Sequence, residues 1–218
     1  SDLVSDTAES HHAYEEIQRL TEQYNNLGGG KWNGLMDAAP RQLPVFADAN
    51  GRLQEETADL EGIAVNACDY SEATGGAQTI QMLGHSMNAV SLPKGGELIY
   101  DFDTDREGEA TLYTAMIPTQ PNDKGDLRYS VSIDGNEPVV ISLKTPYRSE
   151  AWKKSVMRGQ ALKETKVKVG GGKHRLVIKA LDDHIIADQW MLDFKQGRKF
   201  YVIPVGKVCQ KGAKKNDR

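Results

Sequence analysis

The feature that most constrains the fold is an alternation of apolar and polar residues that dominates the chain after residue 62. It is clearest over residues 127–133, where every second residue is apolar: Leu127, Tyr129, Val131 and Ile133. Side chains of a strand point alternately to its two faces, so this spacing predicts strands with one buried face and one face in water. The alternation therefore favours antiparallel sheets packed in two layers.

Turn residues divide the alternating region into short strands. Asp134-Gly135 predicts a hairpin between 127–133 and 138–143, and Gly170-Gly171-Gly172 predicts a second hairpin between 163–169 and 173–181. The count is about eight to ten strands, which is typical of a sandwich or jelly roll. Only 149–160 interrupts the pattern, as a predicted short helix. We expect a mainly β fold, an antiparallel β-sandwich preceded by one N-terminal α-helix and a connector.

The N-terminal helix is predicted over residues 9–27. Its apolar residues recur at steps of three and four: Tyr14, Ile17, Leu20 and Tyr24. Ser10 is the expected N-cap, Glu15 the expected partner of Arg19, and Gly28-Gly29-Gly30 the expected stop. Such a helix needs a partner surface, which is either the sandwich or helices upstream of this chain. We favour the second, because no further helix of equal quality follows.

Four segments are predicted. Residues 1–30 would be a helix from the end of a preceding helical domain, 31–60 a connector, 61–205 the β-sandwich, and 206–218 a basic disordered tail. The tail lacks aromatic residues and the chain carries a net charge of −4, so we expect no nucleic-acid partner. No run of about 18 apolar residues occurs, so we expect no membrane partner.

Motifs of catalysis and metal binding are absent from the sequence. There is no HExxH zinc pair and no Gly-x-Ser-x-Gly elbow, and Cys68 and Cys209 lack CxxC neighbours, so both are predicted to be free thiols. The acidic run 101–109 resembles a calcium loop, but Arg106 replaces its glycine and Leu112 its bidentate glutamate. It is predicted to be a solvated strand face and turn, and we expect no metal and no cofactor.

An ordered series of motifs, from AYEEIQRLTEQYNN to GKHRLVIKALDDHIIADQWMLDF, resembles glycoside hydrolase family 115, the xylan α-1,2-glucuronidases. The series begins with AYEEIQRLTEQYNN and GGKWNGLMDAAPRQLPVF and continues through LGHSMNAVSLPKGGELIYDFD, SEAWKKSVMRGQ and GKHRLVIKALDDHIIADQWMLDF, covering about 11–205. The resemblance implies the end of the family's helical domain followed by its C-terminal β-sandwich, which is of the jelly-roll, galactose-binding-like kind. It also implies that the full enzyme removes glucuronate or 4-O-methylglucuronate from xylan by inversion.

The same resemblance implies that the catalytic carboxylates lie upstream, so no catalytic residue is assigned to this chain. The implied partners are the upstream catalytic and helical domains, a second copy in a homodimer, and xylan or glucuronoxylan. Because xylan occurs outside the cytoplasm, the parent enzyme is expected to be extracellular or periplasmic, although the first residues show no signal peptide.

Aromatic residues are weighed as platforms for sugar rings, with packing in the core or against another domain as the favoured alternative for each tryptophan. Four residues are put forward as ligand or domain-interface candidates: Trp32, Asn33, Arg41 and Trp152. Trp190 alternates with Leu192 and Phe194 and is predicted to be core. Three functions remain open at this point: a non-catalytic accessory domain of a glucuronidase, an autonomous xylan-binding module, and a hydrolase in its own right.

Overall fold

The computed structural model describes residues 2–37, 60–119, 125–198 and 200–205, with side chains described from residue 8. The chain divides into two compact units, Ser1–Asp59 and Leu60–Arg218. No helix among the described residues is long and apolar enough to cross a membrane.

Helix α1 (Asp2–Gly30) forms most of what is described of the first unit. Regular helix ends at Leu27, and Gly28, Gly29 and Gly30 follow at φ of 61°, 69° and 85°. These left-handed conformations suit glycine, so the predicted stop is confirmed. The predicted N-cap is wrong, because the helix already begins at Asp2 and Ser10 lies inside it. The prediction placed the start of the helix close to its apolar repeat, and this repeat begins only at Tyr14, well inside the helix.

Ion pairing on α1 also differs from the prediction. Arg19 pairs with Glu16, one turn away, rather than with Glu15, which lies 3.4 Å from His11 Nε2. The segment after the helix is fastened back to it by Asn25, whose amide donates to the Met36 carbonyl at 2.9 Å and accepts from the Met36 N–H at 3.3 Å. This double contact fixes the turn that carries Trp32 and Asn33.

The apolar residues of α1 remain open to solvent on one face. Ile17, Leu20, Tyr24 and Leu27 are 51%, 49%, 39% and 55% exposed. Their spacing of three and four residues places them in a single row along the helix. A row of this kind is the ordinary signature of a helix that packs against other helices.

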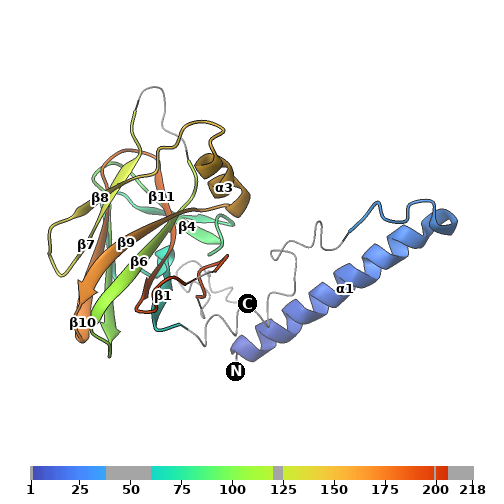
Figure 1. Cartoon of the computed structure of the whole chain (residues 1–218), viewed down its shortest axis with the longest axis horizontal. Coiled ribbons are helices and arrows are strands. Elements are labelled where there is room, and N and C mark those ends of the chain that lie inside the picture. The colour runs from blue at the N-terminus through green and yellow to red at the C-terminus, as the bar shows by residue number, and fades with distance from the viewer. Residues whose placement is uncertain (1, 38–59, 120–124, 199, 206–218) are drawn as a thin grey trace, which may run out of the picture. The chain divides into compact units, whose positions relative to one another are not determined.

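The second unit is a two-layer antiparallel sandwich with one short helix, α3, at its side (Figure 1). Its described elements are β1 (Gly62–Asn66), the 3-10 turn η3 (Ala67–Asp69), β2 (Glu72–Thr74), β3 (Gln78–Gln81), β4 (Asn88–Leu92), β5 (Glu97–Thr104), β6 (Gly108–Met116), β7 (Arg128–Ile133), β8 (Val139–Ser142), α3 (Glu150–Arg158), β9 (Ala161–Val169), β10 (Gly172–Ala180) and β11 (Ile185–Asp193). The predicted mainly β fold is confirmed.

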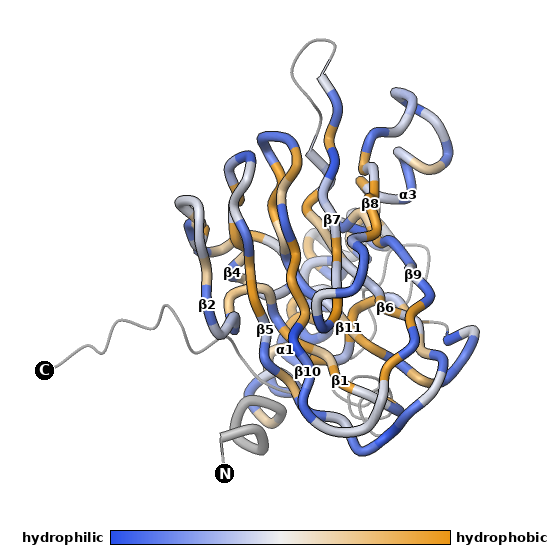
Figure 2. Tube along the Cα trace, turned by 90° about the vertical axis from the view of Figure 1, so that its left-hand side faces the viewer, coloured by the Kyte–Doolittle hydropathy of each residue, from blue (hydrophilic) through white to orange (hydrophobic). Residues whose placement is uncertain are grey.

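Strand order defines the two layers. The six-stranded sheet runs β3-β4-β11-β6-β9, with β1 also paired to β11. The five-stranded sheet runs β2-β5-β10-β7-β8. In Figure 2 apolar stretches follow the strands, and hydrophilic stretches follow the turns that join them.

The core lies between the two sheets and centres on Trp190, which is 1% exposed as predicted. The rings of Tyr100 and Phe102 meet it edge-on, at centroid distances of 5.3 and 5.5 Å. Edge-to-face contacts of this kind are favoured by the ring quadrupoles. A second apolar cluster covers the outer face of the six-stranded sheet, where Tyr113 and Met191 pack with Phe200 and Ile203 from the segment after β11.

The first predicted hairpin is confirmed and the second is wrong. Asp134 and Gly135 turn at φ of 54° and 73° between the paired strands β7 and β8, as a two-residue primed turn requires. By contrast, β9 pairs with β6 and β10 pairs with β5 and β7, so Gly170–Gly172 joins the two sheets. Alternation reports one buried face but does not identify the neighbouring strand, so both pairings fit the sequence equally.

The acidic run behaves as predicted, but the cysteine prediction is wrong. Asp101 and Asp103 are exposed on the outer face of β5, while Phe102 is buried. Cys68 is 0% exposed and disulfide-bonded, not a free thiol. The other cysteine of the sequence, Cys209, lies outside the described residues.

Candidate functional site

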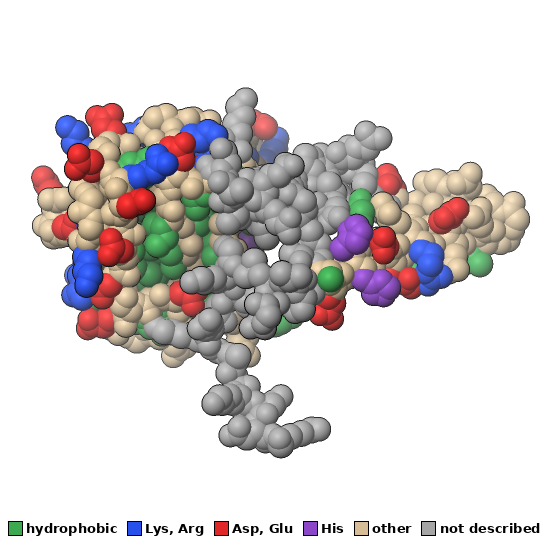
Figure 3. All heavy atoms as spheres, turned by 90° about the horizontal axis from the view of Figure 1, so that it is seen from below, with side chains coloured by type: hydrophobic (Ala, Val, Ile, Leu, Met, Phe, Trp, Pro, Cys, Tyr) green, Lys and Arg blue, Asp and Glu red, His purple; other side chains and the backbone are tan. Residues whose placement is uncertain are grey.

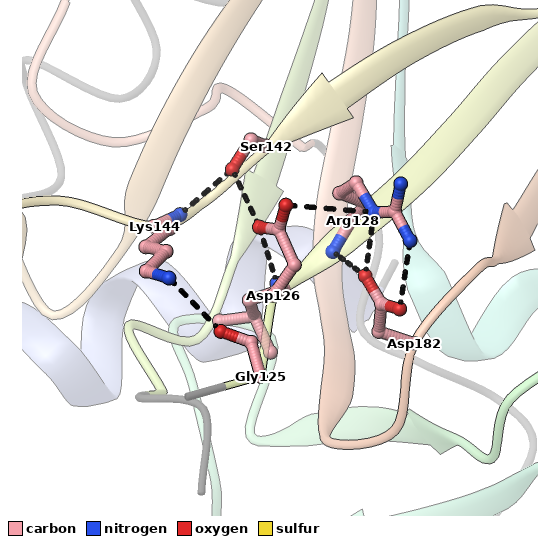
Figure 4. A network of polar contacts seen from close by, with 7 residues as sticks. Gly125, Asp126, Arg128, Ser142, Lys144 and Asp182 are labelled. Atoms are coloured by element: carbon pink, nitrogen blue, oxygen red, sulfur yellow. Dashed lines mark hydrogen bonds and ion pairs between the residues drawn. The ribbon is translucent and has the colours of Figure 1, made fainter. Parts of the chain in front are cut away.

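The segment between β8 and β9 crosses from the five-stranded to the six-stranded sheet and carries α3. Its start is fixed to the sheet, because the Leu143 N–H donates to the Leu127 carbonyl at 2.8 Å and the Leu143 side chain is 5% exposed. Beside it, Lys144 donates from its backbone N–H to Ser142 Oγ and from Nζ to the Gly125 carbonyl (Figure 4). These contacts hold the base of the crossing segment.

Arg128, the first residue of β7, lies between the carboxylates of Asp126 and Asp182 and extends this network of polar contacts. Arg128 makes two side-chain hydrogen bonds to Asp182, at 2.9 and 3.2 Å, and lies 3.6 Å from Asp126 (Figure 4). The hydrogen bonds from Arg128 hold the pKa of Asp182 below its usual value. Asp126 in turn accepts from Ser142 Oγ at 3.2 Å. The network therefore ties β7, β8 and the β10–β11 connection together below the crossing segment.

The crossing segment then makes a tight turn that exposes an aromatic ring. The Ser149 N–H donates to the Pro146 carbonyl at 3.0 Å, which places Tyr147 and Arg148 at the two central positions. Arg148 has a φ of 59°, in the region where a turn ordinarily holds glycine or asparagine. The Tyr147 side chain at this corner is 71% exposed.

Helix α3 braces the exposed tyrosine. Ser149 caps the helix by accepting from the Trp152 N–H at 3.2 Å. The Trp152 ring meets the Tyr147 ring edge-on at 5.2 Å, and the Arg148 guanidinium lies 5.2 Å from the Tyr147 ring centre. An aromatic contact and a cation–π contact thus hold the tyrosine in place. We call Tyr147, Arg148 and Trp152 the aromatic corner.

Positive charge gathers around the aromatic corner. Residues 147–158 contain four basic residues and one acidic residue, whereas the whole chain has a net charge of −4. Lys153 pairs with the one acidic residue, Glu150, at 2.7 Å. On the face of the sandwich that Figure 3 shows, acidic and basic side chains are mixed. The Arg158 guanidinium packs on the rings of Phe200 and Tyr201, so Arg148 is the basic group of the corner itself.

The C-terminal end of α3 is anchored by a buried polar network. Asp188 is 0% exposed and accepts from the His85 N–H at 2.8 Å, the Ser86 N–H at 3.1 Å and Gln160 Nε2 at 2.6 Å. The Ser86 hydroxyl also donates to it. The His85 ring meets the Arg158 carbonyl at 2.8 Å. This network joins the loop before β4 to the end of α3 and to β11.

A second cluster of charged groups lines a pocket of about 630 Å³ at the other end of the five-stranded sheet. Arg175 makes two hydrogen bonds to Asp101, at 2.8 and 3.3 Å. His174 lies between two oxygen acceptors, Asp134 at 2.7 Å and the Gly170 carbonyl at 3.0 Å. Asp101 is thus held by Arg175 and Asp134 by His174, which gives these two carboxylates a structural role.

The acid stability of the sandwich follows from these pairs. Burial raises the pKa of Asp134, but hydrogen bonds from His174 and the Arg175 N–H outweigh it and the pKa is lowered. The Arg175 hydrogen bonds likewise lower the pKa of Asp101. A carboxyl group with a lowered folded-state pKa contributes stability above its unfolded pKa of about 4 and loses it as the pH falls further. We expect the melting temperature to decrease as the pH is lowered below about 4.

A variant isolates this contribution. Asp134→Asn should lower the melting temperature at pH 7 and flatten its decline between about pH 4.5 and pH 2.5, since the titrating group is gone. Asp105→Asn, at an exposed position on the β5–β6 turn, is the matched control. Thermal melts by circular dichroism measure both. An unchanged pH profile in Asp134→Asn would contradict the assignment.

The sequence-predicted candidates lie in different units. Trp32 is 42% exposed, with Lys31 Nζ 5.0 Å from its ring centre. Asn33 lines a polar pocket of about 530 Å³ on the first unit. Arg41 lies outside the described residues. The structure brings Trp32 and Asn33 together in the turn that follows α1, in the first unit. Trp152 belongs to the aromatic corner of the second unit.

Sequence reasoning missed Tyr147, whose side chain is 71% exposed. The available signal was local, namely a Pro-Tyr-Arg-Ser run directly before the short predicted helix. Pro146 favours a turn and Ser149 an N-cap, and a residue between the two lies at a corner of the chain. Among the described residues, no group of three or more His, Cys, Asp and Glu side chains could hold a metal ion.

The fold and the corner define a β-sandwich domain with an exposed aromatic ring at its side. The model of the glycosyl hydrolase family 115 C-terminal domain matches residues 63–205. The chain therefore belongs to glycosyl hydrolase family 115 and contains its C-terminal domain.

A solved structure of the same family agrees with this placement. A family GH115 4-O-methyl-α-glucuronidase with specificity for decorated arabinogalactans is 35% identical, with a TM-score of 0.58, and the match covers 84% of this chain and 24% of that one. This chain thus spans about a quarter of the length of that relative. A family 35 carbohydrate-binding module from Clostridium thermocellum aligns at 12% identity and a TM-score of 0.47, covering 60% of this chain and 98% of the module. A search of curated protein sequences found no match.

Proposed function

We propose that this chain is the non-catalytic C-terminal part of an α-glucuronidase and that it supports assembly of the enzyme. The observation that carries the proposal is the exposed apolar row of α1, formed by Ile17, Leu20, Tyr24 and Leu27. A helix with such a row gains stability by packing against others. We propose that this apolar row packs against a preceding helical domain of the same enzyme. The length of the solved relative supports this, because the match covers only 24% of that protein.

An association experiment tests the assembly role. The chain and the upstream portion of the same enzyme, produced as separate polypeptides, should co-elute in size-exclusion chromatography and show binding by calorimetry. Leu20→Glu should weaken this binding by about tenfold or more, because it places a charge at the centre of an apolar interface. Gln18→Glu adds the same charge to the polar face and should leave binding unchanged. Equal effects of the two variants, or no association, would refute the proposal.

The substrate proposed for the whole enzyme is xylan bearing α-1,2-linked glucuronate or 4-O-methylglucuronate. The solved relative is a 4-O-methyl-α-glucuronidase with specificity for decorated arabinogalactans. That name supports 4-O-methylglucuronate as the sugar released. The polysaccharide that carries it is then either xylan, as proposed here, or arabinogalactan. Release of 4-O-methylglucuronate from glucuronoxylan and from an arabinogalactan by the whole enzyme separates them, and a preference for arabinogalactan would overturn the xylan proposal.

A second candidate function is an autonomous carbohydrate-binding module. It is favoured by one observation, the 71% exposure of Tyr147 beside Trp152. The two functions differ in what the chain does alone, because a module binds glycan without the upstream domains.

Export of the enzyme is part of the proposal, and the disulfide bond at Cys68 supports it, since such bonds persist in oxidising compartments.

A further inference from the structure

We propose that the aromatic corner is a binding site for glycans that carry a uronic acid. The proposal rests on the assignment of the chain to a glycan-processing enzyme and adds a site, its residues and the chemical class of its ligand. Tyr147 would contact the apolar face of a sugar ring, Arg148 would pair with the uronate carboxylate, and Trp152 would position the tyrosine.

Exposure and rigidity of Tyr147 are the first support. The ring is 71% exposed, yet it is held by Trp152 at 5.2 Å and by a turn closed through the Ser149 N–H and the Pro146 carbonyl. A ligand that meets a pre-positioned ring loses less conformational entropy on binding. Aromatic rings that combine exposure with fixed geometry are characteristic of recognition surfaces.

The position of Arg148 is the second support. Its guanidinium lies beside the tyrosine ring at 5.2 Å, and its backbone occupies a left-handed conformation that disfavours residues with a side chain. An arginine is the side chain best suited to bind a carboxylate through two parallel hydrogen bonds. A ring for stacking and an adjacent guanidinium together match one sugar that has an apolar face and a carboxylate.

The local charge selects an acidic ligand. The segment 147–158 carries four basic residues against one acidic residue in a chain of net charge −4. Electrostatic attraction to this segment raises the association rate of anions and falls with added salt. A nucleic acid would also be attracted, but the acidic balance of the whole chain opposes a long polyanion that extends beyond the corner.

The test uses the full 218-residue chain and three probes. These are xylotriose carrying one 4-O-methylglucuronate, the same oligosaccharide with its carboxylate reduced to an alcohol, and a single-stranded oligonucleotide. Titration followed by heteronuclear NMR should show binding of the acidic oligosaccharide with shifts at residues 147–152. Weaker binding is expected for the reduced form and at higher salt.

Two variants separate the roles of the ring and the guanidinium. Tyr147→Ala should weaken binding of both oligosaccharides by about tenfold. Arg148→Gly suits the left-handed backbone, so it should keep or raise stability, and it should abolish the preference for the acidic form over the reduced form. The matched control is Trp32→Ala, which removes an exposed ring that also has a lysine beside it, and it should leave binding unchanged.

Each outcome decides one proposal. Tighter binding of the oligonucleotide than of the acidic oligosaccharide, an equal loss in Trp32→Ala, or no binding of either oligosaccharide would overturn the uronate site. If no oligosaccharide binds but the chain still associates with its upstream domains, the accessory function stands without this site. If the acidic oligosaccharide binds and the upstream association fails, the site stands and the accessory function falls.

Discussion

Replacing Asp188 with alanine is expected to destabilise the sandwich by about 3–5 kcal/mol, one of the two largest effects of a single change proposed for this chain. The Asp188 oxygens accept from the Ser86 N–H, the Ser86 hydroxyl and Gln160 Nε2 in the buried interior, and from the His85 N–H, which is half-buried. Removing the carboxyl group takes this acceptor from the two N–H groups and the Ser86 hydroxyl, while Gln160 Nε2 keeps its hydrogen bond to Gln189 Oε1 at 3.0 Å. Each unsatisfied buried donor costs about 1–3 kcal/mol.

The position of Asp188 explains why this loss cannot be absorbed locally. It lies where the pairing of β11 shifts register between Ala187 and Gln189, and where the neighbour of β11 changes from β4 to β1. Gly84 approaches so closely that a Cβ there would lie 2.3 Å from Asp188 Oδ1. The loop before β4 is therefore packed directly on the carboxyl group of Asp188.

Thermal denaturation measures the effect. A loss of this size should lower the melting temperature by on the order of 10 °C for a unit of this length. The loop before β4 and the end of α3 should also become sensitive to proteases, because Asp188 joins them. Asp126→Ala is the matched control, since it removes a carboxylate that is 42% exposed, and it should cost less than about 1 kcal/mol. Equal losses in the two variants would refute the role assigned to Asp188.

The sequence predicted the elements of the sandwich better than their pairing. The alternation over 98–102 and 127–133 placed Tyr100 and Tyr129 inside, and both are buried. Each apolar residue reports only that its own face is covered, so the hairpin across Gly170–Gly172 could not be distinguished from a crossover between sheets. Long-range pairing depends on contacts between residues far apart in the sequence, and local patterns do not encode them.

The candidate site was predicted in part for a related reason. Trp152 was identified because aromatic rings can stack on sugars and because it lies in the one helical insert of the sandwich. Tyr147 became visible only when the turn at Arg148 and the edge-on contact with Trp152 were seen together. The Asp188 network was hidden altogether, because its donors come from residues about 28 to 103 positions away in the sequence. Polar groups that converge through tertiary structure leave no periodic signal.

Breaking the disulfide bond at Cys68 is the other change expected to have a large effect, about 2–5 kcal/mol. Cys68 lies in η3 at 0% exposure, directly after the strand that pairs with the end of β11. Its neighbour Ala67 accepts a hydrogen bond from the Tyr100 hydroxyl at 2.8 Å, which connects η3 to the core. A cross-link at this point restricts the unfolded chain and holds η3 against the sandwich.

Cys68→Ala should therefore lower the melting temperature of the oxidised chain by on the order of 10 °C, and a reducing agent should lower that of the unaltered chain to a similar value. The same agent should change the melting of Cys68→Ala little, which separates loss of the cross-link from loss of packing at a buried position. Alkylation without prior reduction, followed by mass spectrometry, checks the premise, because a disulfide-bonded Cys68 resists alkylation even in denaturant. Modification of Cys68 under those conditions would mean that the thiol is free, and the destabilisation by reductant should then be absent as well.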